Sequence, residues 1–435
     1  MTQPLSWGQL LAILAATCQD LPDQRTGKNS QYTISDAALG AFGVFFTQTP
    51  SFLARQRDMQ RRKGCNNAQS LFGVAQIPSD PQIRNLLDPI APAHLRPPFW
   101  TVLERLAAPG ALQDYRSFGD GLLCSLDGTQ YFSSTQVHCA QCTVIEKETG
   151  TRYAHTVLIP ALVRPGKAEV LVMEPEFIMP QDGAEKQDCE RNAARRWIER
   201  NGPQLAAQRV TILADDLHCH QPFCELLQAQ HLNFILTCKP DSHPTLYEEV
   251  ALLTKIGAVT QVRDRRWTGQ GYEVWTYRYV NQVPLRAGPK ALAVNWCALT
   301  IVSATTGEVL YHNAWATDHA LAEHTIRAVV SAGRGRGKIE NETNNGLKNQ
   351  GYHLEPNDGH GKQYLAAVVV QLILLAFLLH TVLQLCDQQY RRLRAALGTR
   401  KTFFDDMRAL TRYHYFRGWE QLRAFMLAGL ELTPD

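Results

Sequence analysis

The spacing of hydrophobic and polar positions changes twice along the 435-residue chain. In residues 1–115, apolar side chains recur at mixed helical spacing, as in 7–18 and 34–47, and proline-rich breaks separate the runs. From Gly121, short apolar runs alternate with turn residues, which indicates strands. Beyond residue 386 the chain is polar, basic and helix-like. The pattern predicts helical N-terminal and C-terminal regions on either side of a sheet.

The central part predicts an α/β fold with a mixed sheet. Short turns such as Asp127-Gly128 link the first three strand-like runs, which favours antiparallel pairing. Helix-like runs at 184–201 and 222–230 then alternate with two further strands. The predicted strands are residues 121–127, 152–163, 169–174, 209–213 and 233–238.

Residues 239–330 interrupt this order, because runs rich in Trp, Tyr, Val and Thr predict a β-rich insertion. Its strand-like runs are 263–280, 292–302 and 309–315, and a helix-like run follows at 321–331. The predicted divisions are a helical, candidate DNA-binding region at 1–115, an α/β core at 116–238 and 331–386, the insertion at 239–330 and a basic helical region at 387–435.

Residues 364–385 hold no formally charged side chain over 22 positions, counting histidine as neutral. By length alone such a segment could span a bilayer. Gln371, His380 and Gln384 interrupt it, and a central helix buried on all sides has the same composition. We therefore expect a buried helix and no membrane partner; a membrane-associated protein is the alternative.

Charge changes the picture locally. The formal net charge is only +3, but residues 51–63 hold five cations and one acid and end in Arg61-Arg62-Lys63. Residues 390–424 hold nine cations and three acids, with aromatic residues between them. Phosphate-binding surfaces need such patches, although a solvated helix face has the same pattern. Eleven cysteines spread along a long chain predict a reducing cytosol and not a secreted disulfide framework.

Three acids suggest phosphodiester chemistry. Asp127 and Asp215 stand at the ends of predicted strands, and such ends open onto the crevice where ligands bind. Adjacent carboxylates repel unless a cation lies between them, and Mg²⁺ prefers oxygen ligands. The charged stretch 334–348 offers Glu340 as a third ligand for a two-metal site. The plainer interpretations are that Asp127 forms a turn and that Asp215-Asp216 caps a helix.

The order strand–Asp, strand–Asp, helix–Glu, together with the neighbouring residues, resembles the DDE transposases of bacterial insertion sequences. The closest resemblance is to the subset with a β-rich insertion before the Glu, and it covers most of residues 115–385. The segments that carry it are Leu126-Asp-Gly-Thr-Gln-Tyr-Phe-Ser-Ser134, Leu213-Ala-Asp-Asp-Leu-His218, and Lys338-Ile-Glu-Asn-Glu-Thr-Asn-Asn-Gly-Leu-Lys348 with Gly351-Tyr352.

The resemblance implies a ribonuclease H-like core in which Asp127, Asp215 and Glu340 bind two Mg²⁺ or Mn²⁺ ions. It implies DNA end cleavage and strand transfer by a homodimer on paired transposon ends, with double-stranded DNA as partner and target. The expected location is the bacterial cytoplasm, at the nucleoid. A catalytically inactive or domesticated DNA-binding relative and a stand-alone nuclease are the alternatives.

The resemblance also assigns DNA-contacting residues. Arg336 stands four residues before Glu340, as the family's Arg does, whereas Lys348 comes one residue late. Gly333 replaces the family's Tyr, and Arg334 is the candidate to compensate. The predicted DNA-binding residues are Arg61, Arg62, Lys63, Arg334, Arg336 and Lys348. A Trp of the insertion stacks on an extruded base in relatives; the candidates, for which core packing is the plainer role, are Trp267, Trp275, Trp296 and Trp315.

Cys139 and Cys142 form a CxxC turn, which is half of a structural zinc site. No second CxxC follows, so reduced, half-buried cysteines are the plainer interpretation. The residues considered to complete the site are Cys124, His155, Cys189, Cys219 and Cys224. The histidines after Glu340 are expected to be structural polar groups; they are His353, His360 and His380.

Overall fold

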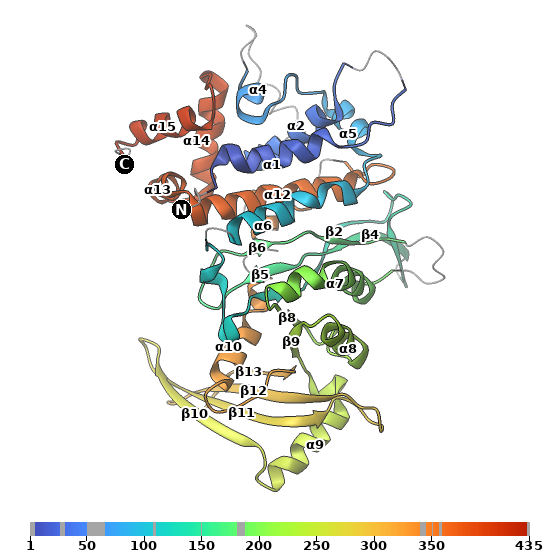
Figure 1. Ribbon diagram of the computed structural model, residues 1–435, viewed down its shortest axis with the longest axis vertical. Helices are drawn as coiled ribbons and strands as arrows, with labels where there is room; N and C mark the ends of the chain where they lie inside the picture. The colour runs from blue at the N-terminus through green and yellow to red at the C-terminus, as the bar shows by residue number, and fades with distance from the viewer. Residues whose placement is uncertain are drawn as a thin grey trace.

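The structure of the protein is a computed structural model that describes most of the chain. The described residues are 5–26, 31–49, 66–107, 110–148, 150–180, 188–339, 345–349, 351–355 and 359–432. Along the long axis of the molecule, a helical bundle, a central sheet with its helices and a β-rich end follow one another (Figure 1).

Helices from both ends of the chain build the helical bundle. Trp7 packs on Trp419 with ring centroids 4.5 Å apart. The Asn67 amide donates to the carbonyl oxygens of Thr411 and His414, at 2.6 and 2.8 Å. The helices are α1 (Trp7–Gln19), α2 (Ile34–Phe46), α4 (Asn67–Phe72), α5 (Asp80–Leu87), α6 (Pro97–Ala107), α12 (Leu365–Cys386), α13 (Gln388–Ala396), α14 (Arg400–Tyr413) and α15 (Trp419–Gly429). The prediction of helices at both ends is confirmed, and the two ends pack together.

Helix α12 is the buried core of this bundle. By length and composition it could cross a membrane, with a mean hydropathy of 2.5 over its most apolar 18 residues. That window is completely buried, because α2 covers α12 on one side and β6 contacts it from the sheet. His380 within it bonds the Tyr352 hydroxyl at 2.5 Å, as a structural polar group does. The predicted buried helix is confirmed.

A nine-stranded mixed sheet forms the centre, in the order β10-β11-β12-β13-β9-β8-β1-β5-β6. Strands β5 and β1 pair antiparallel, whereas β8 runs parallel to β1 and β9 parallel to β8. The strands are β1 (Leu123–Ser125), β5 (Ala161–Val163), β6 (Leu171–Val172), β8 (Thr211–Ala214), β9 (Asn233–Thr237), β10 (Thr260–Trp267), β11 (Tyr272–Pro284), β12 (Ala293–Ser303) and β13 (Val309–Thr317). The predicted mixed α/β class is confirmed.

A smaller sheet pairs β2 (Gly128–Ser134), β4 (Gly150–Leu158) and β3 (Thr143–Lys147), with β7 (Glu176–Ile178) on β4. Strand β1 of the larger sheet leads into β2, and β4 leads back into β5, across a bend between the two sheets. At this bend the Ile159 N–H donates to the Asp127 carbonyl at 2.9 Å. The bend splits the predicted single strand 152–163 into β4 and β5, whereas the predicted strand 121–127 forms only the shorter β1. Strands β2 and β3 were not predicted, because most of their side chains are polar or exposed and leave little hydrophobic alternation.

Two helices connect the later core strands, α7 (Glu190–Ala207) and α8 (Gln221–Ala229). The predicted end of α7 at residue 201 is wrong, because the helix continues through Pro203. Leu205, beyond the proline, is buried in the core, and Gly202 allows a close approach: a Cβ there would lie 2.2 Å from Oε1 of Gln230. Packing thus overrides the local break that Gly202-Pro203 signals.

The β-rich segment predicted within residues 239–330 contains β10–β13. It extends the central sheet, since Trp315 of β13 pairs with Thr237 of β9. Helix α9 (Pro244–Lys255) precedes it, and α10 (Ile326–Arg334) and α11 (Asn345–Asn349) follow it. Short 3₁₀ helices lie at Pro92–Leu95, Gln113–Tyr115, Phe118–Asp120 and Pro240–Ser242.

Candidate functional site

The carboxyl ends of β1 and β8 bring two aspartates to one edge of the sheet. The strands are adjacent and parallel, with Ser125 paired to Leu213. Leu126 extends the pairing by donating its N–H to the Leu213 carbonyl at 2.8 Å. The ends of the two strands therefore lie side by side, and Asp127 and Asp215 each follow two residues after this last pair.

Asp127 and Gly128 do not form the turn that their sequence allows. Gly128 begins β2 and pairs with Leu158. A Cβ on Gly128 would lie 2.1 Å from Oε2 of Glu190, the first residue of α7. The glycine therefore lets the start of α7 approach the strand, and Glu190 in turn contacts Nε2 of buried His218 at 3.0 Å. This acid beside Asp127 was not anticipated, because only folding brings α7 to β2.

The neighbouring acids Asp215 and Asp216 have different partners. Asp216 Oδ1 accepts from the Lys239 N–H at 2.7 Å, and its Oδ2 accepts from the Ser242 hydroxyl at 2.5 Å. Asp216 therefore braces the loop after β9. Asp215 accepts from the Leu217 N–H at 3.0 Å, and the N-cap position of α8 is occupied by His220 instead. Asp215, which directly follows β8, is therefore the acid of this pair that does not bind the loop after β9.

The chain that leaves α10 returns to this edge. The Arg336 guanidinium donates to Oδ1 of Asp127 at 2.9 Å, and the Arg336 carbonyl accepts from the Ser125 hydroxyl at 3.4 Å. Ile339 is completely buried. The segment that follows α10 therefore lies close to Asp127. Its last described residue is Ile339, and Glu340 lies outside the described residues.

Gly333, where the resemblance expects Tyr, is closed off by a tryptophan. A Cβ on Gly333 would lie 2.7 Å from Nε1 of Trp315 and 2.9 Å from its Cε2. The neighbouring Arg334 stacks on Trp275 and Tyr311, with its guanidinium carbon 4.9 and 4.8 Å from the ring centroids. The indole of β13 therefore fills the space beside this position, and the insertion holds Arg334.

The remaining predicted DNA contacts are only partly described. Lys348 Nζ lies 3.4 Å from the Gln130 carbonyl oxygen of β2 and 3.1 Å from the Glu355 carboxylate. Arg61, Arg62 and Lys63 lie outside the described residues, as does the whole basic segment 51–63.

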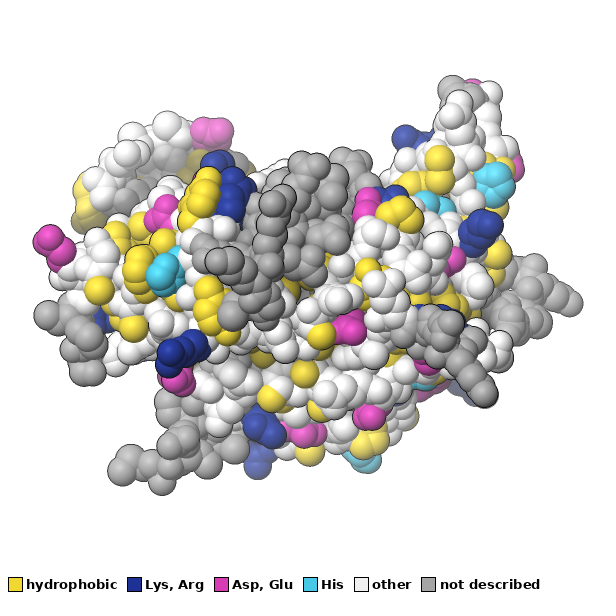
Figure 2. All heavy atoms as spheres, turned by 90° about the horizontal axis from the view of Figure 1, so that it is seen from above, with side chains coloured by type: hydrophobic (Ala, Val, Ile, Leu, Met, Phe, Trp, Pro, Cys, Tyr) yellow, Lys and Arg dark blue, Asp and Glu magenta, His cyan; other side chains and the backbone are white. Residues whose placement is uncertain are grey.

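The aromatic residues of segment 390–424 mostly build the core of the helical bundle. Those that are buried are Tyr390, Phe403, Phe404, Phe416 and Trp419. Tyr413, by contrast, is 72% exposed. On the face of the bundle seen in Figure 2, Lys and Arg side chains are scattered among acidic and apolar ones. The aromatic part of the predicted phosphate-binding pattern is therefore explained by packing.

The tryptophans of the insertion differ in accessibility. Trp296 and Trp315 are buried, as core packing predicts. Trp275 carries the Arg266 guanidinium 3.8 Å from its ring centroid. Trp267, at the end of β10, is 60% exposed, with the Tyr272 ring centroid 4.9 Å from its own.

Two cysteines and two histidines meet beside β2. Cys139 and Cys142 lie between β2 and β3, His155 in β4, and His360 before α12. The two Sγ atoms are 3.9 Å apart, and each lies 3.5 Å from Nε2 of His155. His360 Nε2 lies 3.5 Å from Sγ of Cys142 and 3.4 Å from Nε2 of His155. These four side chains could hold a metal ion and are compatible with a zinc site.

The sequence anticipated one histidine of this cluster and not the other. His155 was among the residues considered to complete the CxxC turn, whereas His360 was expected to be a structural polar group. No spacing signals the pair, because 205 residues separate them. Burial, with His360 beside it, lowers the pKa of His155 to about 4, so its imidazole is neutral at physiological pH, the form that binds metal.

A second group consists of Cys219, Cys238 and His243, which are all buried with ligand atoms within 4.8 Å of one another. In the part of the chain that the structure describes, these two Cys/His groups are the ones with three or more potential ligands. Asp127 and Asp215 do not belong to a group of three potential ligands among the described residues, which do not include Glu340. The described residues therefore give no support of their own to a Mg²⁺ site.

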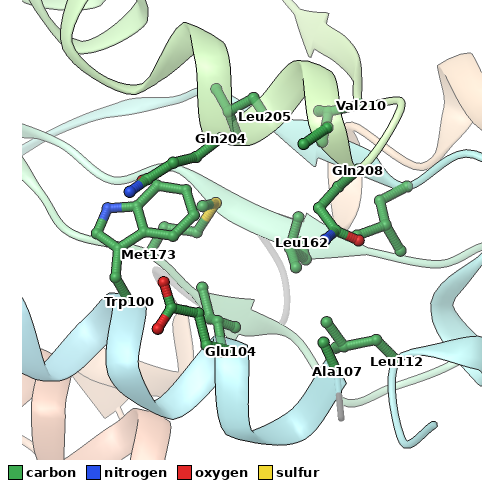
Figure 3. A pocket seen from close by; sticks show the side chains of 13 residues that line it. Trp100, Glu104, Ala107, Leu112, Leu162, Met173, Gln204, Leu205, Gln208 and Val210 are labelled. Atoms are coloured by element: carbon green, nitrogen blue, oxygen red, sulfur yellow. The ribbon is translucent and has the colours of Figure 1, made fainter.

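A pocket of about 190 Å³ opens between α6 and α7 (Figure 3). Trp100 of α6 and Gln204 of α7 face each other across it, and its lining is largely apolar. Leu122 and Val210, which precede β1 and β8, also line it. The pocket therefore lies at the opposite ends of these strands from the two aspartates and is separate from their site.

Comparison of the chain with protein-family models gives no match, and no curated protein shows significant similarity to it. The interpretation of the site therefore rests on its geometry and on the sequence motifs.

Proposed function

We propose that the protein is a DDE transposase, which cuts the ends of an insertion sequence and joins them to target DNA. The observation that carries this proposal is the parallel pairing of β1 with β8, whose adjacent carboxyl ends precede Asp127 and Asp215 by two residues each. The chain leading to Glu340 reaches the same edge, where Arg336 contacts Asp127. Two strand-end acids joined by a third from a distant segment are the ligands that two-metal phosphodiester chemistry needs.

The strand order supports a ribonuclease H-like core for this proposal. In the order β6-β5-β1-β8-β9, three strands pair antiparallel and the last two run parallel to β1. Strands β10–β13 lie between β9 and the segment leading to Glu340, where the resembling transposases carry their insertion.

Each charged group has a role in this proposal. Asp127, Asp215 and Glu340 would hold two Mg²⁺ or Mn²⁺ ions, which activate water or a DNA 3′-hydroxyl and stabilise the leaving oxygen. Arg336 offsets the charge of Asp127, since adjacent carboxylates repel, and its planar guanidinium suits a phosphate beside the acids. The further phosphate contacts would come from Arg61, Arg62, Lys63, Arg334 and Lys348.

Mg²⁺-dependent cleavage of a labelled duplex carrying the terminal repeats of the element tests the proposal. Asp127→Asn and Asp215→Asn should each reduce cleavage to background, because an amide is a weak ligand for a hard cation. Asp216→Asn is the matched control: its amide oxygen can still accept from the Lys239 N–H, so cleavage should persist. An inactive parent protein, or an Asp215→Asn variant as active as Asp216→Asn, refutes the proposal.

A pre-cleaved end supplied with a target duplex separates the remaining possibilities. A transposase joins the two, a stand-alone nuclease cuts without joining, and an inactive relative binds the ends without either reaction. Binding should weaken steeply with salt, because phosphate contacts release counterions. Cross-linking on paired ends should capture two protomers. The zinc ion considered at Cys139 and Cys142 is a separate proposal.

A further inference from the structure

We propose that Cys139, Cys142, His155 and His360 bind one structural zinc ion, which fastens the chain before α12 to the small sheet. Three ligands belong to the sheet, two from the β2–β3 loop and one from β4. The fourth, His360, comes from a segment far along the chain. Zinc binding stands independently of the proposed DNA chemistry.

The distances between the ligand atoms are those of a tetrahedron around zinc. With Zn–S of about 2.3 Å and Zn–N of about 2.05 Å, tetrahedral angles give S···S of about 3.8 Å, S···N of about 3.6 Å and N···N of about 3.3 Å. The observed values are 3.9 Å for the two sulfurs, 3.5 Å for three S···N pairs and 3.4 Å for the two nitrogens. The sixth pair, Cys139 with His360, is within 4.8 Å.

The surroundings favour a closed, structural ion. Four protein ligands leave no open position for water or substrate, which distinguishes structural from catalytic zinc. Two thiolates and two neutral imidazoles balance the charge of Zn²⁺, so burial of the complex is tolerated. The imidazoles are held by aromatic rings: Tyr131 stacks on His155 at 5.5 Å, and Phe132 lies 4.2 Å from His360.

A disulfide does not explain the cluster. The sulfurs of Cys139 and Cys142 are 3.9 Å apart, whereas a disulfide bond is about 2.05 Å long. A disulfide would also give no reason for two histidine Nε2 atoms to converge on the same point. A metal ion accounts for all four side chains at once.

The ion would join parts of the chain that surround the acidic edge. His360 follows Glu340 by twenty residues, and between them Lys348 reaches the Gln130 carbonyl of β2. Strand β2 itself begins at the residue after Asp127. Zinc would therefore fasten the segment that returns from Glu340 to the strand that follows Asp127. This consequence for the acids, unlike zinc binding, rests on the proposed function.

Zinc per chain, measured by mass spectrometry of the purified full-length protein, is the first test. Because Cys219, Cys238 and His243 also cluster, the readout is a difference between variants. Cys142→Ser should hold one zinc fewer than the parent. Cys18→Ser, which changes a cysteine that is also buried but lies in α1, should match the parent. Equal zinc in the parent and in Cys142→Ser overturns the proposal.

A ligand exchange keeps the proposal testable if Cys142→Ser fails to fold. The protein is loaded with Co²⁺ in place of zinc, and the visible spectrum reports the ligand set. His360→Cys replaces an imidazole by a third thiolate, so its sulfur-to-cobalt charge-transfer absorption should rise by about half. A spectrum unchanged by His360→Cys would show that His360 is not a ligand. DNA cleavage is not needed for either measurement, so failure of the transposase proposal leaves both readable.

Discussion

The contact between Gly333 and Trp315 allows a quantitative test of packing at the end of α10. The change is Gly333→Ala, which adds one methyl group. Its carbon would lie 2.7, 2.9 and 3.0 Å from Nε1, Cε2 and Cδ1 of the indole. Carbon atoms in good contact are about 3.5–4.0 Å apart, so three ring atoms overlap with the methyl by roughly 0.5 Å or more. The ring cannot easily withdraw, since Trp315 is 1% exposed and its strand pairs on both sides.

Two effects oppose each other in this variant. Alanine is favoured over glycine inside a helix by about 0.8–1.0 kcal/mol. Overpacking a well-filled core costs about 1–3 kcal/mol, and a rigid ring in contact at three atoms belongs at the upper end of that range. The expected result is a net loss of about 1–2 kcal/mol in the free energy of unfolding, with Tm lower by a few degrees.

Thermal and urea unfolding of purified variants measure the effect. Gly337→Ala is the matched control, because nothing lies within 4 Å of a Cβ built there. It should leave stability unchanged or raise it slightly. In a Trp315→Ala background, Gly333→Ala should become stabilising, since only the helix preference remains. If Gly333→Ala is as stable as Gly337→Ala, or destabilises equally without the indole, the packing argument is refuted.

Three further predictions concern other parts of the molecule. A strong zinc chelator should lower Tm more in the parent than in Cys142→Ser, because bound metal stabilises the folded state; equal sensitivity would contradict a zinc ion at this cluster. Burial raises the pKa of Asp318 to about 6, so its ionisation destabilises the folded protein as pH rises from 4 to 6. In urea unfolding above pH 6, Asp318→Asn should therefore have a free energy of unfolding about 1–3 kcal/mol higher than that of the parent, and this gain should vanish near pH 4. A difference that does not change with pH would contradict this reasoning. Asn67→Ala should lower the free energy of unfolding by about 2–4 kcal/mol, because it removes hydrogen bonds to Thr411, His414 and Phe416 and leaves buried groups unpaired. A loss below about 0.5 kcal/mol in urea unfolding would contradict the idea that these bonds hold the two ends of the chain together.

Much of the architecture follows from the sequence alone. Apolar spacing is a local property, so the helices at both chain ends, the five core strands and the β-rich insertion could be predicted from it. The uncharged run 364–385 also identified the central helix, because only a core or a membrane offers so apolar an environment. Local spacing also predicts that Asp127 and Asp215 stand at strand ends, since a strand end depends only on the residues around it.

Tertiary structure decided what depends on distant contacts. Asp216 and Asp215 look alike in sequence, and only the loop after β9 gives Asp216 its structural partners. Most aromatic residues of 390–424 are buried in the helical bundle, as Trp419 is against Trp7 of α1 and Leu71 of α4, and this packing could not be deduced from their spacing among basic residues. Gly333 could not be understood without the indole of Trp315 beside it.

The Cys/His cluster shows the division most clearly. The CxxC turn of Cys139 and Cys142 is visible in the sequence because its two ligands are neighbours. His155 and His360 are not, because chain folding alone brings residues 205 positions apart into contact. Local residue patterns therefore determine which elements form and which side chains stand at their ends. Burial of hydrophobic surface between remote segments then decides which of those side chains meet. That driving force is non-directional, so local spacing shows which face of an element is buried but not which remote segment covers it.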